Sequence, residues 1–424
     1  MSAEAAVVLP RQAVNAKLVA LIAAAAIFLG VFLSGFVIDE PAPYELYMAP
    51  LMAVWALFGL RISRAIAPLI VMLVFFNIGG MIAMTQMANL MQTPLYLAVS
   101  LFLALTAIFY AAILEARSDF YRLIVIAWTA SAVVTATFGI CGYFNAFPGA
   151  EIFTRYGRAM GFFQDPNVFG PFLVLPGIYL FYRILTGKPS TVFLFTIPLL
   201  VIALGILLSF SRGAWGLFVC TCILLTAALF LQSRSGRFRL RVIVMSVVVV
   251  TIVALAVLAI LQIPGVSEFF LSRAHLEQSY DTARLGRFAR YGLGLDLALQ
   301  HPLGIGPLVF GQIYGEDTHD IWLKALLDYS WLGFLSWLAL TIWTIVAGFP
   351  LLLRNRPWQP YVLCAYVVFI GHILLGTVID IDHWRHLYLL IGMIWGGIAL
   401  EKRHQRSPAA PHLSAAGQAF RRPG

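Results

Sequence analysis

An arginine lies in a short polar break between two long apolar runs. It is Arg212, within a segment Ser-Phe-Ser-Arg-Gly-Ala-Trp that starts at Ser209. Ser211 is a preferred N-cap residue, and a helix N-terminus beside a guanidinium group forms a site for an anion. An arginine at the end of an apolar helix can also serve only to anchor that helix. Arg212 is therefore a candidate catalytic residue for chemistry on an anionic group, with the anchoring role as the alternative.

Three further arginines, Arg284, Arg287 and Arg290, recur at every third position. On a helix this spacing places them close together, beside the apolar residues Leu285 and Phe288. Such a helix is suited to lie on a membrane surface, where its arginines attract lipid headgroups. The alternative is that one or more of the three arginines binds a phosphate group of a substrate.

A histidine, His319, lies where a polar segment gives way to the next apolar run, between Asp317 and Asp320. Histidine changes its charge near neutral pH, so at this position it can act as a general base or transfer a proton. A histidine at such a boundary can also be purely structural. We take His319 as a candidate catalytic residue.

A fourth segment runs from Arg158 to Gly170 with the sequence R-A-M-G-F-F-Q-D-P-N-V-F-G. Its Asp-Pro-Asn part, which ends at Asn167, has the composition of a turn that starts a helix. Arg158 and Asn167 can instead contact a polar ligand, and both are candidate substrate-binding residues.

Two carboxylates and two histidines gather between Asp380 and His386. They are enough ligands for a metal ion, but their spacing matches no metal-binding signature. We expect a polar loop here and no metal site. The chain has no phosphate-binding loop, dinucleotide fingerprint or HExxH motif, so we also expect no cofactor.

The elements that must position these residues are membrane helices. Of 424 residues, 61% are hydrophobic and 11% are charged, whereas a soluble domain has about 25% charged residues. The sequence predicts an all-α, polytopic membrane helix bundle of about 12 transmembrane helices, since its apolar runs are long enough to cross a bilayer core of about 30 Å. The expected spans are 18–38, 46–60, 65–87, 94–114, 121–142, 168–185, 191–208, 213–232, 240–263, 326–353, 360–379 and 384–400.

Residues 1–406 are expected to form one membrane domain, with a long loop over about 264–320 that contains amphipathic helices. The tenth span is expected to include an interfacial helix before it crosses the bilayer. Residues 407–424 are rich in Pro, Ala and Arg, a composition typical of a disordered tail.

The distribution of positive charge predicts the orientation. With the N-terminus inside, the inner segments hold 19 of the 28 Lys and Arg residues, the outer segments hold eight, and Lys324 is assigned to neither. Positive residues concentrate on the cytoplasmic side of membrane proteins, so both termini are expected there and the candidate residues in the periplasm. The basic residues are scattered over short loops, which favours a topology signal and contact with membrane lipids over nucleic-acid binding.

Four of these segments, in this order and on one predicted face, resemble the O-antigen ligase and polymerase family. The resemblance covers roughly residues 150–400. Members of this family are similar in fold to membrane glycosyltransferases of the C type. The segments are R-A-M-G-F-F-Q-D-P-N-V-F-G, L-S-F-S-R-G-A-W, R-F-A-R-Y followed by Q-H-P-L-G-I-G-P, and T-H-D-I-W-L-K-A-L-L-D-Y-S-W-L-G.

The resemblance implies transfer of a glycan from undecaprenyl pyrophosphate to an acceptor hydroxyl at the periplasmic face of the inner membrane, without a metal. The acceptor would be lipid A-core or a growing polysaccharide. Arg212 matches the family's S-R-G arginine, Arg287 its loop arginine, and His319 its histidine. Arg290 and Gly294 also fit an R-x3-G pattern, so the register of this match stays open. Arg284 and Arg290 are therefore kept as substrate-binding candidates.

Two departures separate this chain from the family pattern. Asp320 stands where members usually have Asn, Ser or Gln, and Ser330 stands where a glycine is expected, although Gly333 is kept. We expect direct attack in one displacement that inverts the anomeric centre. The alternative function is a transporter or flippase that moves a lipid-linked glycan without glycosyl transfer. Few ionisable residues such as Asp328 lie within apolar runs, which favours the enzyme.

Overall fold

The computed structural model describes residues 11–90, 93–263, 266–268, 270–271 and 287–406. The predicted tail and Arg284 lie outside these residues. The helices and strands are α1 (Arg11–Leu33), α2 (Pro43–Leu57), α3 (Ala67–Met84), α4 (Thr93–Ala116), α5 (Phe120–Tyr143), η1 (Ala150–Phe153), β1 (Thr154–Arg155), β2 (Arg158–Ala159), α6 (Pro166–Phe172), α7 (Val174–Thr186), η2 (Pro189–Thr191), α8 (Val192–Leu208), α9 (Arg212–Gln232), α10 (Gly236–Ile260), α13 (Arg287–Gln300), α14 (Val309–Tyr314), α15 (Ile321–Asp328), α16 (Ser330–Leu352), α17 (Gln359–Leu375) and α18 (Arg385–Arg406).

The fold is helical, as predicted, with one small antiparallel hairpin in which Thr154 pairs with Ala159 and Arg155 with Arg158. Within the described residues, nine segments are helical, long and apolar enough to cross a membrane. They are Asn15–Leu33, Ala67–Met84, Thr93–Ala116, Phe120–Tyr143, Pro166–Thr186, Pro189–Leu208, Arg212–Gln232, Gly236–Ile260 and Ser330–Leu352. The chain is thus a multi-pass membrane helix bundle.

The other three predicted spans are also helical but fall outside this group of nine. Helix α2 has 15 residues and α17 has 17. Helix α18 has 22 residues, but it begins at an arginine and ends in the charged sequence Glu-Lys-Arg-His-Gln-Arg. The predicted count of about 12 spans therefore depends on three helices that are shorter or more charged than the rest.

Two predicted spans are interrupted. The span expected at 168–185 consists of α6 and α7, which meet at Leu173. The stretch expected to begin with an interfacial helix is divided into α15 and α16, and the break falls at Tyr329. A short helix, α15, thus directly precedes the tenth crossing, while its predicted location at the membrane interface stays a prediction. Both breaks lie beside the candidate residues.

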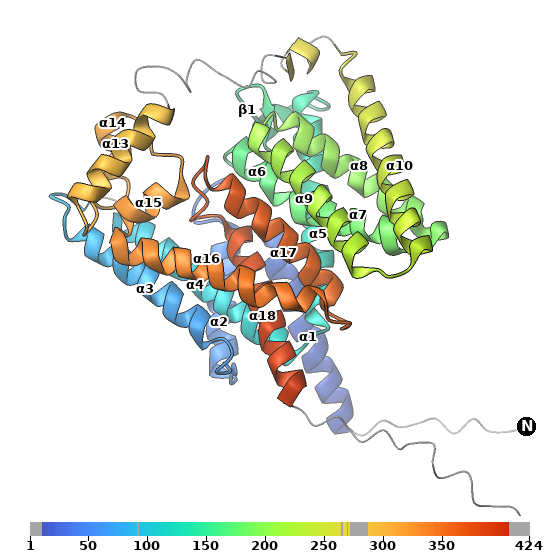
Figure 1. The fold of residues 1–424 in the computed structure, drawn as a ribbon, viewed down its shortest axis with the longest axis horizontal. Helices are drawn as coiled ribbons and strands as arrows, with labels where there is room; N and C mark the ends of the chain where they lie inside the picture. Colours follow the sequence, from blue (N-terminus) through green and yellow to red (C-terminus); the bar gives the residue numbers. More distant parts are fainter. Residues whose placement is uncertain (1–10, 91–92, 264–265, 269, 272–286, 407–424) are drawn as a thin grey trace, which may run out of the picture.

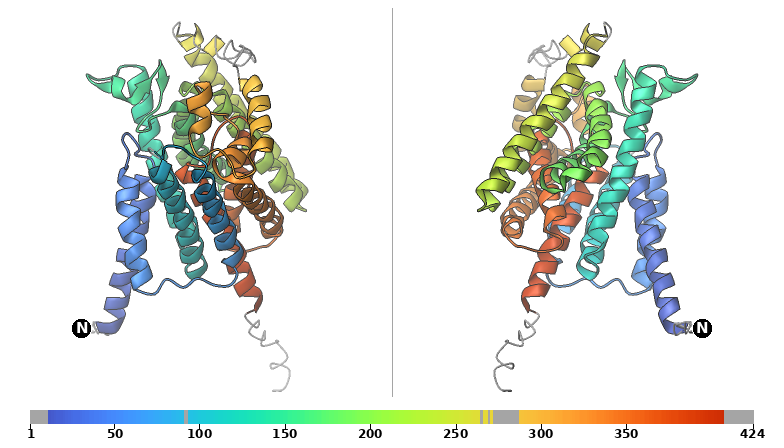
Figure 2. Two further views of the ribbon diagram at one scale, coloured as in Figure 1. Left: turned by 90° about the vertical axis from the view of Figure 1, so that its left-hand side faces the viewer. Right: turned by 90° about the vertical axis from the view of Figure 1, so that its right-hand side faces the viewer.

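The two ends of the bundle carry different groups of elements. The start of α1 (blue) and the end of α18 (red) lie at one end, which we call the terminal end, and α13–α15 lie toward the other (Figures 1 and 2). Arg356, just before α17, pairs with Glu401 near the end of α18 through two hydrogen bonds of 2.8 and 3.0 Å. The end of α17 and the start of α18, residues 375–385, therefore lie at the opposite end, which we call the site end.

Small residues bring α3 and α16 into close contact. A Cβ atom on Gly79 would lie 2.2 Å from the carbonyl oxygen of Tyr329 and 2.6 Å from the amide nitrogen of Gly333. Only glycine permits this approach, which is the usual way in which membrane helices pack tightly. The contact fixes the start of α16 and hence the position of α15 directly before it.

Candidate functional site

Arg158 holds together two segments that are far apart in the sequence. Its side chain is buried, Nε donates to the carbonyl oxygen of Ser209 at 2.7 Å, and Nη2 donates to Oδ1 of Asn167 at 2.8 Å. A planar guanidinium suits two such hydrogen bonds in different directions. Arg158 and Asn167, both predicted as substrate-binding residues, thus contact each other, and Arg158 also contacts the turn that leads to Arg212.

Asn167 is placed by the start of α6. The Asp165 side chain caps this helix by accepting a hydrogen bond of 2.8 Å from the backbone nitrogen of Asn167, which confirms the predicted turn and helix entry. One helical turn further on, a Cβ atom on Gly170 would lie 2.5 Å from Cβ of Ala214. The segment from Arg158 to Gly170 therefore packs directly against the beginning of α9.

Arg212 is the first residue of α9 and follows a tight turn. Phe210 has a φ of 45°, in the left-handed region, and the Ser211 side chain caps the helix by accepting from the backbone nitrogen of Ala214 at 3.4 Å. The predicted cap is confirmed. A Cβ atom on Gly213 would lie only 2.6 Å from Cδ1 of Leu375. The turn that contains Arg212 therefore packs against the end of α17.

His319 lies in a second tight turn, at the start of α15, and has a φ of 52°. Oδ1 of Asp320 caps this helix by accepting hydrogen bonds of 2.8 Å from the backbone nitrogens of Trp322 and Leu323. Asn and Ser are also strong N-cap residues. The departure at Asp320 therefore preserves the capping function at this position.

The end of α17 connects the segments that carry the predicted catalytic residues. The backbone nitrogen of Ile321 donates to the carbonyl oxygen of Gly376 at 2.8 Å, next to the Leu375 side chain that contacts Gly213. Arg212 and His319 consequently lie at the same end of the bundle.

Helix α13 joins this arrangement through Tyr291. The hydroxyl group of Tyr291 lies 3.2 Å from the carbonyl oxygen of Thr377 and 3.4 Å from that of His319. Arg287 begins this helix. The predicted loop helix is confirmed for residues 287–300, and its buried positions 290, 294 and 298 recur at every fourth residue, on one face.

Arg290 has a carboxylate partner. Its Nη1 lies 2.5 Å from Oε2 of Glu316, and only 5% of the Arg290 side chain is exposed, against 64% of the Glu316 side chain. A guanidinium that is buried in a salt bridge is less available to a substrate than a solvent-facing one. The ion pair with Glu316 therefore favours a structural role for Arg290 over its predicted role in substrate binding.

A buried ionic cluster lies beside His319. Nζ of Lys324 is 3.0 Å from Oδ2 of Asp317, 3.3 Å from Oδ2 of Asp328 and 3.9 Å from Oδ2 of Asp380. The same Asp380 oxygen is 3.7 Å from Nδ1 of His319. Asp380 therefore links the histidine to the ionic cluster.

The cluster changes the acid–base properties of its members. Burial raises the pKa of Asp380 from its ordinary value of 3.8 to about 7, and the nearby Lys324 ammonium opposes part of this shift. Burial lowers the pKa of Lys324, but the surrounding carboxylates, above all Asp328, more than offset this and raise it well above its usual range. The lysine stays charged, and Asp380 titrates near neutral pH.

Asp382, His383 and Arg385, in the same segment as Asp380, bind partners other than His319. Oδ2 of Asp382 accepts from the hydroxyl groups of Tyr96 at 2.7 Å and Tyr329 at 3.1 Å, and lies 2.8 Å from Nδ1 of His383. Arg385 pairs with Glu40 and Glu45. Within the described residues, no group of three His, Cys, Asp or Glu residues could hold a metal ion.

Sequence reasoning missed the contribution of Lys324 and Tyr291 to this region. Lys324 and Asp328 are four residues apart in an otherwise apolar helix, a spacing that indicates an ion pair and could have revealed them. The sequence predicts only a polar loop around Asp380. No sequence signal connects it with His319, because their contact depends on how α15 packs against the end of α17.

Ser330 is the second departure from the family pattern, in which a glycine is expected at this position. It is buried and has a φ of 64°, a conformation that glycine adopts without strain and serine does not. The backbone here thus has the geometry that a glycine would favour.

A search of the curated proteins found no match to this chain. Residues 197–338 match the family model described as O-Antigen ligase. This range includes Arg212, Arg287 and His319, and it excludes Arg158 and Asp380. Over residues 197–338 the chain is therefore similar to the O-antigen ligase family.

Proposed function

We propose that this protein is a membrane glycosyltransferase that transfers a glycan from undecaprenyl pyrophosphate to an acceptor hydroxyl at the periplasmic face of the inner membrane. The observation that carries the proposal is the meeting of the Arg212 turn and the His319 turn on consecutive residues, Leu375 and Gly376, at the end of α17. A cation for the leaving group and a base for the acceptor then belong to one site. The family match over residues 197–338 supports the same class of lipid-linked substrate.

On the donor side of the reaction, arginine side chains are proposed to stabilise the pyrophosphate leaving group. Negative charge grows on the pyrophosphate as the glycosidic bond breaks, and guanidinium groups stabilise such charge most strongly where water is partly excluded. Arg212 begins α9, so the positive end of the helix dipole adds to its charge. We assign Arg212 and Arg287 to the pyrophosphate, with Arg158 and Asn167 positioning the turn that carries Arg212.

On the acceptor side, His319 is proposed to deprotonate the acceptor hydroxyl, with Asp380 beside it. Asp380 lies on the Nδ1 side of the ring at 3.7 Å, and we assign to Nε2 the role of taking the proton of the acceptor hydroxyl. Catalytic hydrogen bonds are often longer before the substrate binds. A carboxylate behind the imidazole fixes its tautomer and stabilises the imidazolium that forms. Asp380 is thus proposed as the residue that positions His319.

The proposed reaction is a single displacement. The acceptor oxygen attacks the anomeric carbon, the bond from that carbon to the pyrophosphate oxygen breaks, and the acceptor proton passes to His319. The configuration at the anomeric carbon is inverted. The leaving group departs as undecaprenyl pyrophosphate, and arginine side chains rather than a metal ion neutralise its charge. The acceptor is lipid A-core or the end of a growing polysaccharide.

The topology completes the proposal. The start of α1 and the end of α18 lie at the terminal end of the bundle (Figure 2), and the excess of Lys and Arg in the inner segments supports a cytoplasmic location for that end. The site end then faces the periplasm, where a glycan on its lipid carrier and the acceptor are both accessible.

The test uses the purified full-length protein in vesicles with an undecaprenyl pyrophosphate-linked glycan and candidate acceptors. Arg212→Ala and His319→Ala should each abolish most of the glycosidic product. Matched controls are Arg155→Ala, which removes an exposed arginine near the site end, and His301→Ala, which removes an exposed histidine after α13; both should keep activity. Full activity in the two site variants would refute the site. Movement of the carrier across the vesicle with no glycosidic product would refute glycosyl transfer and favour the transporter.

A further inference from the structure

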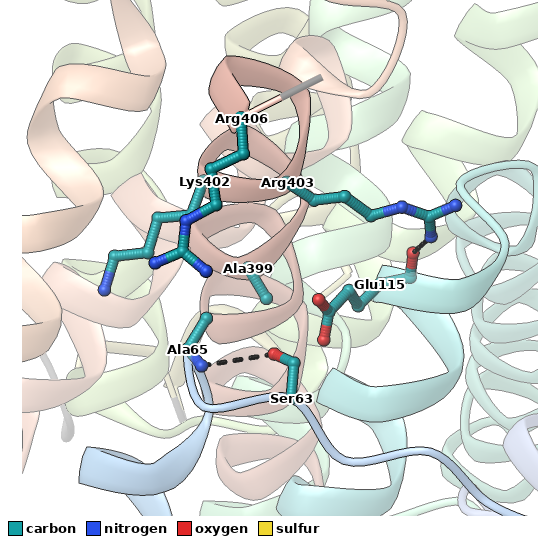
Figure 3. Close-up of a pocket in the computed structure, with 7 residues that line it drawn as sticks. All are labelled: Ser63, Ala65, Glu115, Ala399, Lys402, Arg403 and Arg406. Carbon is teal, nitrogen blue, oxygen red and sulfur yellow. Dashed lines mark hydrogen bonds between the residues drawn. The ribbon is translucent and has the colours of Figure 1, made fainter. Parts of the chain in front are cut away.

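A hollow of about 400 Å³ lies at the terminal end of the bundle, away from the proposed transfer site. Three segments surround it: the loop before α3, the end of α4 and the last turns of α18 (Figure 3). Its lining residues are Ser63, Ala65, Glu115, Ala399, Lys402, Arg403 and Arg406. The proposed glycosyl transfer has no role for this hollow.

Two of the lining cations have no carboxylate partner. Lys402 and Arg406 are one helical turn apart on the same face of α18, and in the part of the chain that the structure describes neither has a hydrogen bond or ion pair. On the same end of the bundle, Arg354 and Arg356 both pair with Glu401. Like charges four residues apart on a helix repel each other, so an anion between Lys402 and Arg406 would relieve this repulsion.

The opposite side of the hollow carries a carboxylate. Glu115 is 9% exposed and, within the described residues, no Lys, Arg or His nitrogen lies within ion-pair distance of it. Figure 3 shows Glu115 on one side of the opening and Lys402 and Arg406 on the other. Arg403 lies over Glu115, and its Nη1 donates to the Glu115 carbonyl oxygen at 3.0 Å. The hollow thus presents separate positive and negative sides.

We propose that this hollow binds the headgroup of a membrane phospholipid, with the phosphate between Lys402 and Arg406 and a headgroup hydroxyl or ammonium donating to Glu115. Helix α4 is long and apolar enough to cross a membrane, so its end, beside the last turns of α18, would lie among the lipid headgroups, where each Lys or Arg attracts an anionic headgroup. Arginine offers a planar pair of donors to phosphate oxygens, and lysine a compact charge. A simple anchoring role needs the cations alone and gives Glu115 no function.

The experiment measures binding of short-chain dihexanoyl-phosphatidylglycerol to the full-length protein in detergent by native mass spectrometry. The double variant Lys402→Gln with Arg406→Gln should bind the lipid about tenfold more weakly than the wild type, because two attractive charges are lost. The matched control, Lys17→Gln with Arg237→Gln, removes the same charges from exposed positions outside the hollow and should bind as the wild type does. The exchanged variant Lys402→Arg with Arg406→Lys should retain most of the binding.

Equal weakening in the two neutralised variants would overturn the proposal, because it would mean a diffuse attraction to positive charge. Glu115→Gln should weaken phosphatidylglycerol binding and leave binding of inorganic phosphate unchanged. Inorganic phosphate that displaces the lipid at equal concentration would also overturn the assignment to a lipid headgroup. Glycosyl transfer by the neutralised variant reports on the site end separately, so the two proposals can fail independently.

Discussion

His319 and Asp380 come from different segments, and the structure places Nδ1 of the histidine 3.7 Å from Oδ2 of the aspartate. The same carboxylate oxygen lies 3.9 Å from Nζ of Lys324, whose side chain is buried. The aspartate is thus held between a permanent cation and a titratable ring. This arrangement makes the protonation of Asp380 the feature through which pH should act on the proposed reaction.

Transfer activity should rise with pH through about 7, the pKa to which burial raises that of Asp380. Below this pH the carboxyl group is protonated and no longer carries the negative charge that stabilises the His319 imidazolium. His319 must also be unprotonated to act as a base, so Asp380→Asn should change the shape of this acidic limb without abolishing it, and should lower kcat by about 100-fold, the lower range for lost acid–base function. The measurement is a pH–rate profile of both proteins. An unchanged profile in the variant would remove Asp380 from the mechanism.

The same shift makes a prediction about stability. The folded pKa of Asp380 lies above 3.8, its ordinary value, so the unfolded chain ionises first as the pH rises. The contribution of Asp380 to stability is therefore greatest below about pH 4 and is lost progressively up to about pH 7. Over this window the melting temperature of Asp380→Asn should improve relative to the wild type, which thermal unfolding in detergent can measure. A constant difference across this range would contradict the shift.

Arg212→Lys should lose most of the activity even though it keeps the charge. Lysine offers a point charge where the pyrophosphate is proposed to contact a planar pair of donors. Arg212→Ala should lower kcat by about 10²–10³-fold, as expected for the removal of one group that stabilises developing charge. Steady-state kinetics with the lipid-linked donor provide the measurement. Near wild-type kcat for Arg212→Lys would mean that charge alone suffices.

Arg158 and Asn167 should be coupled energetically. Arg158→Ala leaves the Ser209 carbonyl and the Asn167 side chain without their hydrogen bonds, at a cost of about 1–3 kcal/mol for a buried group. Asn167→Ala should cost less once Arg158 is already absent. A double-mutant cycle of unfolding free energies tests this. Strictly additive effects would show that the bond between the two side chains contributes nothing to holding the turn.

Arg287 and Arg290 should respond differently to neutralisation. Arg290→Gln and Glu316→Gln should both lower the melting temperature, because each breaks the ion pair between the two residues. Arg287→Gln should instead lower kcat with little change in stability, as its proposed partner is the substrate. Comparing thermal unfolding with kinetics separates the two arginines. A stable Arg290→Gln variant with low kcat would assign the phosphate contact to Arg290 instead.

Ser330→Gly should stabilise the protein. It removes a left-handed φ from a non-glycine residue, a strain of about 1–2 kcal/mol. It also removes a buried hydroxyl oxygen that has no hydrogen-bond partner among the described residues. The greater freedom of glycine in the unfolded chain offsets part of this gain. Gly79→Ala should act in the opposite direction, because its Cβ atom would collide with the Tyr329 backbone. Thermal unfolding of both variants provides the comparison.

The sequence by itself determined the class of fold and the order of the helices. Apolar runs long enough to cross a bilayer predict helices directly, since a chain in lipid must satisfy its own backbone hydrogen bonds. Local signals also predicted the turn at Asp165 and the cap at Ser211, because a capping residue acts on amides only two or three positions away. The resemblance identified Arg212, Arg287 and His319 through short motifs of the same local kind.

The tertiary structure alone decided which of these residues meet. The sequence predicts only a polar loop around Asp380, and the contact of Asp380 with His319 follows from the packing of α15 on the end of α17. The same holds for the bond from Arg158 to the Ser209 carbonyl and for the partner of Arg290. A single sequence carries no signal for such contacts, because helix packing brings together side chains whose positions in the chain are unrelated.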